Sequence, residues 1–270
     1  MRWSRVLAVV RRDLTVALGS KAIVLPAVIV PLLLLVVLPT AIGLAPRYVD
    51  ADALGDVEQL LVLLPAEVLG TLPEDPALLG AVVTLTYLLT PLILLVPVML
   101  STVLAADGIA GEQERGTLEG LLLTPLSDRE LATAKLLTAW VPAVVIGLLG
   151  AALYAMVTNL TLGRQMGEWL LPTTEFMVLA VWTGPTFGAA ALGAVSLVSV
   201  RSRTTQDAFQ LGGFVVLPVV AMVVGQGAGL LLLSVWALVG AGMVAAGAAV
   251  LLLVAATRSL SRPRLGPRLG

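Results

Sequence analysis

The sequence contains no cysteine and no histidine, and only two of its 270 residues are lysine. Without cysteine the chain has no disulfide, no thiolate metal site and no cysteine nucleophile. Without histidine it lacks the commonest general base and metal ligand of proteins. Lys21 and Lys135 lie outside any G-x-x-x-x-G-K-[ST] phosphate loop, so any dependence on ATP must come from a partner.

Charge is also scarce. Charged residues make up 12% of the chain, about half the ~25% of soluble domains. Hydrophobic residues make up 59%, so the few charges present cannot coat a water-soluble globule of this size. The composition therefore indicates an integral membrane protein. The net charge of −1 gives no basic surface for nucleic acid.

Long apolar runs, several of them interrupted by proline, indicate an all-α fold that forms a single transmembrane domain over residues 1–270. The six predicted membrane spans are residues 22–44, 78–106, 136–157, 174–200, 208–224 and 230–257. The basic and apolar residues 1–21 are typical of an amphipathic helix in the membrane interface. Between the spans we expect a loop over residues 158–173 and a tight glycine-rich turn over residues 225–229. Residues 258–270 are expected to be a basic, loosely ordered tail.

Six spans place both termini on one side of the membrane, and the basic residues indicate which side. Fourteen of the sixteen lysines and arginines fall on the side of the termini, and only Arg47 and Arg164 fall on the other. Because basic residues concentrate in cytoplasmic segments, we expect both termini in the cytoplasm. Residues 107–135, between the second and third spans, are then cytoplasmic as well.

This cytoplasmic segment carries the clearest local pattern of the chain. Ser127 and Glu130 have the spacing of a capping box, in which each side chain accepts a hydrogen bond from the other residue's backbone N–H. Leu126 and Leu131 are placed for the accompanying hydrophobic staple. The pattern predicts a helix that begins near Ser127, and Pro125 ends whatever precedes it.

The preceding residues, 107–123, are expected to form an amphipathic helix with Leu118, Leu121 and Leu122 on one face. Arg115 lies three residues after Glu112 and four before Glu119, a spacing that predicts pairing with both carboxylates. Its glycines weaken such a helix by up to ~1 kcal/mol each, so it needs a surface to pack against. The lipid interface and a cytoplasmic protein are the candidates for this packing surface. A solvated acidic loop without a partner is the simpler alternative to the helix.

Polar residues within the predicted spans are hydroxyls rather than charges. Most of them are expected to make helix–helix hydrogen bonds. A role of Thr84, Thr86 or Thr90 in lining a substrate path is the functional alternative. No ionisable residue falls near the middle of a span, which disfavours an ion-driven transporter. A passive channel or a membrane scaffold remains an alternative, and an intramembrane enzyme would need acids, a Ser–Lys pair or a metal cluster that the spans lack.

The cytoplasmic segment also carries a resemblance to a family. The run from Glu114 to Pro125 reads ERGTLEGLLLTP, and Ser127 and Lys135 follow it. It resembles the E-x-G-T-L-E-x-L-x-x-[ST]-P pattern that type 2 ABC exporter permeases show after their second span. The position between the second and third predicted spans agrees with that family.

The resemblance implies a membrane-spanning permease that works as a homodimer or heterodimer with two copies of a separate ABC ATP-binding subunit in the cell membrane. That subunit would bind ATP and Mg²⁺, and this chain would hold no cofactor and would not be an enzyme. Residues 107–124 would include the coupling helix that sits in a groove of the ATP-binding subunit. The implied partner-coupling residues are Glu112, Glu114, Arg115, Gly116, Thr117, Leu118, Glu119 and Leu122.

Overall fold

The computed structural model describes residues 2–48, 73–116, 126–199, 204, 206, 210, 213–227 and 234–259. Every regular element among these residues is a helix, which confirms the all-α class. Five stretches are long and apolar enough to cross a membrane: Ile23–Arg47, Pro76–Glu114, Arg129–Met166, Thr174–Ser199 and Val235–Arg258. The fifth predicted span, residues 208–224, lies partly outside the described residues, so the count of six stays a prediction.

The first stretch follows a separate N-terminal helix. Its elements are α1 (Trp3–Gly19), α2 (Lys21–Leu32), the π-helix η1 (Leu33–Val37), α3 (Leu38–Leu44) and the 3₁₀ turn η2 (Ala45–Arg47). Ser20 leaves the helical region with φ −87° and ψ 110°, so the chain turns between α1 and α2. Two prolines lie inside α2, and a π-helix follows it directly, as expected where proline disturbs the regular hydrogen bonds.

The second stretch is a broken helix. Its elements are α6 (Pro76–Val83), the π-helix η4 (Thr84–Leu88), the 3₁₀ helix η5 (Thr90–Leu94), α7 (Leu95–Ala106), the π-helix η6 (Asp107–Gly111) and α8 (Glu112–Glu114). Pro91 lies in the first turn of η5 and cannot donate a backbone hydrogen bond. The buried Tyr154 hydroxyl donates to the Leu85 carbonyl at 2.6 Å across this break. A side-chain hydroxyl thus provides a hydrogen bond to a backbone carbonyl in the irregular part of the helix.

This second helix is longer than the sequence indicated. Residues 107–114 continue it, and Gly116 ends it with a left-handed φ of 67°. The prediction of one separate helix over residues 107–123 is therefore wrong at Gly116, because only a residue without a Cβ adopts this φ readily. Residues 117–125 lie outside the described part of the chain.

The third stretch comprises α10 (Asp128–Thr158), the π-helix η7 (Asn159–Gly163) and α11 (Arg164–Met166). The predicted capping box is confirmed: the Glu130 N–H donates to Ser127 Oγ at 3.3 Å, and the Ser127 N–H donates to Glu130 Oε2 at 3.1 Å. The predicted loop over residues 158–173 is wrong in its first half. The helix continues to Met166 because Leu162 packs into the core, and it ends at Gly167 with φ 73°.

The remaining elements are α12 (Thr174–Val178), the π-helix η8 (Leu179–Thr183), α13 (Gly184–Ser199), the 3₁₀ helix η9 (Gly213–Val216), α15 (Leu217–Gly227) and α16 (Val235–Ser259). The predicted turn over residues 225–229 begins too early, because α15 remains helical through Gly227. α13 packs between α7 and α16, and α10 packs on the other side of α7. α15 contacts η4 and η5, the broken part of the second helix.

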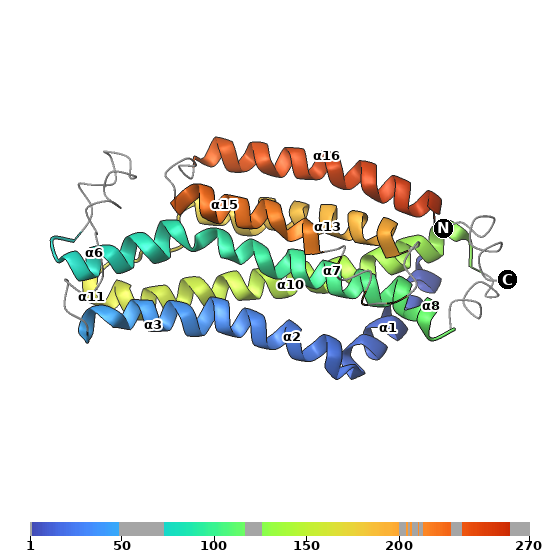
Figure 1. Ribbon diagram of the computed structural model, residues 1–270, viewed down its shortest axis with the longest axis horizontal. Coiled ribbons are helices and arrows are strands. Elements are labelled where there is room, and N and C mark those ends of the chain that lie inside the picture. Colours follow the sequence, from blue (N-terminus) through green and yellow to red (C-terminus); the bar gives the residue numbers. More distant parts are fainter. Residues whose placement is uncertain are drawn as a thin grey trace.

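The bundle has two distinct ends (Figure 1). The N-terminus, α8, the start of α10 and the end of α16 lie together at one, which we call the α8 end. The end of α3, the start of α6 and α11 lie at the other, which we call the α11 end. The chain therefore begins at the same end as the cytoplasmic segment predicted from charge.

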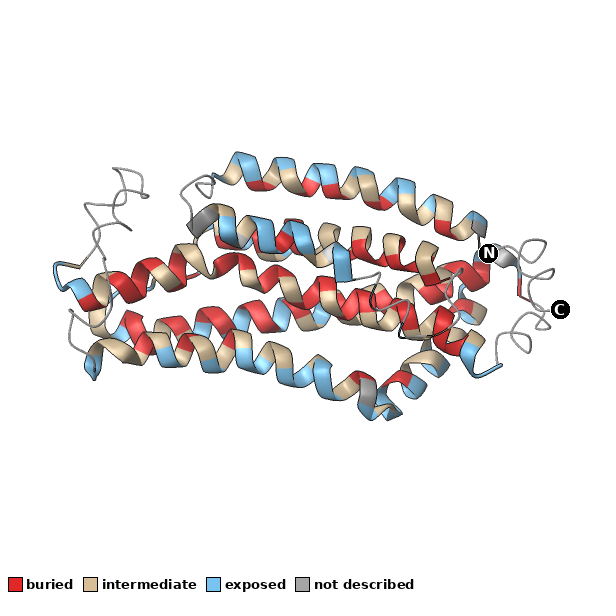
Figure 2. Cartoon of the chain, viewed as in Figure 1, coloured by how far each residue is buried: buried red, intermediate tan, exposed pale blue. Residues whose placement is uncertain are grey.

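Burial identifies the centre of the bundle. In the most apolar part of Pro76–Glu114, 61% of the residues are buried, against 22% in both Ile23–Arg47 and Val235–Arg258. Figure 2 shows long exposed stretches along α2 and α16 and buried residues along α7. Because the exposed stretches are as apolar as the buried ones, they are suited to face lipid or another apolar surface.

Candidate functional site: an ion cluster at the α8 end

The N-terminal helix α1 is held against the start of α10. Val6 and Ala17 are buried on one side of α1, which contacts α10 along its length. The backbone N–H of Arg2 donates to Glu130 Oε1 at 2.7 Å. Glu130 thus serves two elements, since its other carboxylate oxygen closes the capping box of α10.

Four side chains from three elements meet beneath α1 in what we call the ion cluster: Arg12, Asp13, Glu112 and Lys135. Lys135 Nζ lies 2.8 Å from Asp13 Oδ2 and 2.8 Å from Glu112 Oε2. Arg12 Nη2 lies 3.7 Å from Glu112 Oε1. The cluster contains two positive and two negative charges.

Three members of the ion cluster are almost fully enclosed. The side chains of Lys135 and Glu112 are each 7% exposed, and that of Asp13 is 10% exposed. Removing one partner from such a set leaves a buried charge without compensation. The cluster therefore favours one relative placement of α1, α8 and α10, and it couples movement of α8 to both of the other helices.

A second ion pair lies beside the cluster. Arg115 Nη1 donates to Asp107 Oδ1 at 3.0 Å, and this hydrogen bond raises the pKa of the Arg115 guanidinium. The predicted partner Glu112 instead has its carboxylate against Lys135, and its charge contributes to the raised pKa of Arg115 only after that of Asp107. The predicted partner Glu119 lies outside the described residues. The π-helix η6 adds a residue to the turn, so residues eight apart come onto one side of the helix.

A cleft of about 260 Å³ lies among these groups, between α1, the end of the second helix and α10. Its polar wall contains the ion cluster together with Asp107 and Arg115, and Leu104 and Val16 line its apolar side. Gly111 provides room for the Asp107–Arg115 pair, since a Cβ there would lie 2.7 Å from Asp107 Oδ1.

The residues predicted to couple to a partner do not share one environment. Glu112 is buried in the ion cluster, whereas Glu114, Arg115 and Gly116 are exposed at the tip of the second helix. The other four, Thr117, Leu118, Glu119 and Leu122, lie outside the described residues. The structure thus divides the described ones into an inner residue that contacts α10 and outer residues at the surface.

Sequence reasoning missed Asp13 and Arg12. The signal was present in α1, where Asp13 is the one acid among five basic residues of the first 21 positions. It lies seven residues after Val6 and four before Ala17, which places it on the buried side of the helix. An acid on the packed side of a basic helix indicates a buried cation opposite it.

The three threonines considered for a substrate path lie at or beside the break in the second helix. Thr90 is buried, and its hydroxyl donates to the Thr86 carbonyl at 2.7 Å. Thr86 is also buried, and its hydroxyl has no hydrogen-bond partner in the described structure. Thr84 is half-buried at the start of η4. All three belong to the irregular segment that α15 contacts.

Most of the chain matches a known protein family. The family described as ABC-2 family transporter protein matches residues 7–237, which include the whole ion cluster. The chain belongs to the ABC-2 transporter family. This ABC-2 permease is a multi-pass membrane protein and a membrane transport subunit, and permeases of its family normally work with an ATP-binding subunit. Searches of curated proteins and of solved structures found no match.

Proposed function

We infer that this ABC-2 permease is the membrane-spanning subunit of an ATP-driven exporter. Two copies of a separate ATP-binding subunit bind ATP and Mg²⁺, and the permease acts as a homodimer or heterodimer in the cell membrane. The α8 end lies in the cytoplasm, as the distribution of basic residues favours. Residues 107–124 receive the movement of the ATP-binding subunit.

The ion cluster is the observation that carries this proposal. It joins the tip of the second helix to α1 and to the start of α10 through Glu112, Asp13 and Lys135. A push on the exposed residues Glu114 and Arg115 therefore reaches three elements at once. Because Asp13, Glu112 and Lys135 are almost fully enclosed, separating their charges is costly, and the three elements move together.

The break in the second helix gives this movement a place to act. The segment from Thr84 to Leu94 has π and 3₁₀ geometry, which often marks a hinge. Movement of α7 at the α8 end can change the bend at this segment and open a path beside Thr84, Thr86 and Thr90. These threonines are the first candidates for contact with the transported molecule.

The test is to reverse three charges of the coupling segment in one variant that combines Glu114→Lys, Arg115→Glu and Glu119→Lys. We expect co-purification of the ATP-binding subunit to fall roughly tenfold or more, or transport to be lost while ATP hydrolysis continues, because charge complementarity sets such contacts. Membrane insertion should be unchanged.

The matched control is Glu168→Lys, which reverses an exposed charge at the α11 end. This control should retain assembly, ATPase activity and transport. If the combined variant also retained all three, the coupling segment would be assigned wrongly.

A further inference from the structure

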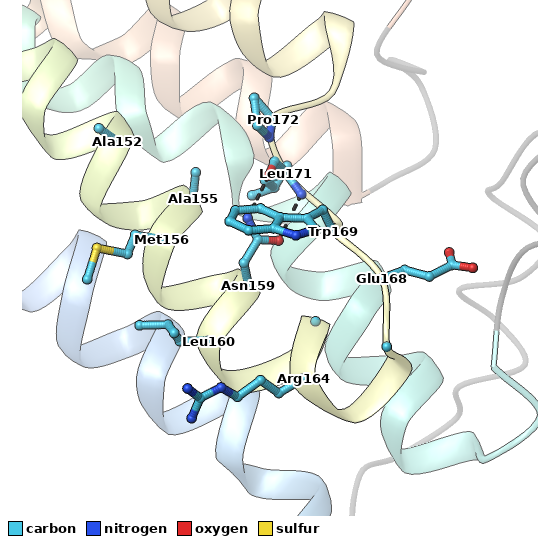
Figure 3. Close-up of a pocket in the computed structure, with 12 residues that line it drawn as sticks. Ala152, Ala155, Met156, Asn159, Leu160, Arg164, Glu168, Trp169, Leu171 and Pro172 are labelled. Carbon is cyan, nitrogen blue, oxygen red and sulfur yellow. Dashed lines mark hydrogen bonds between the residues drawn. The ribbon is translucent and has the colours of Figure 1, made fainter.

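A second cavity lies at the α11 end, away from the ion cluster. It has a volume of about 570 Å³ and is formed by the last turns of α10, by η7 and α11, and by the loop over residues 167–172 (Figure 3). We call it the α11 pocket. It is open to the surroundings of the bundle and not enclosed by the helices.

One wall of the α11 pocket is apolar and ends in a cation. Ala152, Met156, Leu160 and Arg164 recur every four residues along the helix, and all four line the pocket. Met156 is 56% exposed and Leu160 is 45% exposed, although both are large and apolar. Arg164 is exposed and makes no ion pair with any residue that the structure describes. The wall is thus apolar along most of its length and positively charged at one end, as suits an amphiphilic ligand with an anionic head group.

The opposite side of the pocket is a loop held in place by Asn159. The side-chain oxygen Oδ1 of Asn159 accepts from the backbone N–H groups of Leu170 and Leu171 at 2.9 and 3.1 Å. Its amide nitrogen donates to the Leu171 carbonyl at 2.6 Å. These bonds use both ends of the Asn159 amide, and they fix the loop that carries Trp169.

Trp169 and Arg164 have the chemistry of a membrane–water interface. Trp169 is 85% exposed, and its indole lies beside Asn159 at the mouth of the pocket (Figure 3). Exposed tryptophan is enriched at the level of lipid headgroups. Glu168 also lines the pocket, but its carboxylate points away from it in Figure 3, so Arg164 sets the charge inside.

We propose that the α11 pocket binds an anionic phospholipid from the leaflet at this end of the bundle. The lipid phosphate pairs with the Arg164 guanidinium, whose planar donors match phosphate oxygens. One acyl chain follows Leu160, Met156 and Ala152 toward the middle of the membrane. Trp169 covers the glycerol region. The proposal requires only that the protein spans a membrane, so it does not depend on the direction of transport or on the ATP-binding subunit.

The test measures tryptophan quenching by brominated lipids in nanodiscs that contain the full chain. Each variant is made with and without Trp169→Phe, and the difference isolates Trp169 from the other four tryptophans. We expect brominated phosphatidylglycerol to quench Trp169 at about fivefold lower mole fraction than brominated phosphatidylcholine, the factor expected from one basic residue at a membrane surface. Arg164→Ala should remove this difference, and Arg164→Lys should retain part of it.

Arg47→Ala is the matched control, because Arg47 is an exposed arginine in η2, which follows α3 and contacts α6, and it does not line the pocket. It should leave the preference for phosphatidylglycerol unchanged. Equal quenching by the two lipids in the unmodified chain would overturn the proposal, as would equal losses in Arg47→Ala and Arg164→Ala. A fall in the dimer fraction of Arg164→Ala with unchanged quenching would also overturn it, since the pocket would then be a subunit interface.

Discussion

At the scale of single residues, the two lysines of this chain illustrate how burial decides the role of a charge. Lys21 is exposed where α1 turns into α2. Lys135 is the eighth residue of α10, and its ammonium contacts two carboxylates at 2.8 Å. Such a group is tolerated at the membrane boundary because its partners compensate its charge. Lys135 is therefore the residue on which the ion cluster depends.

Replacing this lysine should destabilise the permease. We expect Lys135→Met to lower the free energy of unfolding by about 3–5 kcal/mol, because Asp13 and Glu112 stay buried without their main cation. The combined variant Asp13→Asn, Glu112→Gln, Lys135→Met should recover most of that loss. Reversible unfolding in detergent measures the stability of both variants. Lys21→Met is the control, and its free energy of unfolding should stay within about 0.5 kcal/mol of that of the unmodified chain. Equal stability of the two lysine variants would contradict a structural role of the cluster.

At the scale of elements, close contacts at glycine bring the helices together. Gly188 of α13 lies against Pro97 of α7, where an added Cβ would come 3.3 Å from the Pro97 carbonyl oxygen. Gly193 of α13 faces α16 more tightly still, since an added Cβ would lie 2.7 Å from Leu252 Cβ. Small residues thus set the spacing on both sides of α13.

A methyl group at Gly193 should separate α13 from α16. We expect Gly193→Ala to lower the free energy of unfolding by about 1–3 kcal/mol, because Leu252 Cβ and the Leu253 backbone must move. Gly247→Ala is the matched control in α16, where an added Cβ meets nothing within 4 Å. That variant should be unchanged or stabilised by up to ~1 kcal/mol through helix propensity. A melting comparison in detergent in which both variants behaved alike would contradict this tight contact.

At the scale of the whole molecule, the two ends of the bundle differ in their chemistry. The α8 end holds a neutral and largely enclosed cluster of charges joined to three elements. The α11 end holds an open apolar pocket with a single cation and an exposed tryptophan. An enclosed cluster is suited to transmit movement between helices, and an open amphipathic pocket is suited to contact with lipid. The proposed cytoplasmic coupling and the proposed lipid site thus lie at opposite ends.

The orientation of the two ends can be tested directly, because the chain has no cysteine of its own. Single cysteines are introduced as Arg129→Cys at the α8 end and Glu168→Cys at the α11 end, both at exposed positions. In right-side-out vesicles, a membrane-impermeant maleimide should label the Glu168→Cys variant at once and the Arg129→Cys variant only after permeabilisation. The reverse pattern would place the α8 end outside and would contradict the predicted cytoplasmic coupling segment.

The sequence by itself determined the class of the protein and much of its helical plan. Apolar runs set the membrane fold because backbone groups in lipid must pair within helices. The capping box predicted the start of α10 because Ser127 and Glu130 bond to their own local backbone. These features depend on residues within a few positions of each other, so a single sequence contains the information that they need.

The tertiary structure alone decided which charges meet. Asp13 and Lys135 are 122 positions apart, and their contact depends on how α1 turns back at Ser20 onto α10. The partner of Arg115 depended on the π-helix η6, which changes the register of the helix without an obvious marker in the sequence. The same holds for the α11 pocket, because the sequence indicated a loop where the helix continues to Arg164 and Met166. Long-range packing fixes such features, and local residue patterns therefore could not predict them.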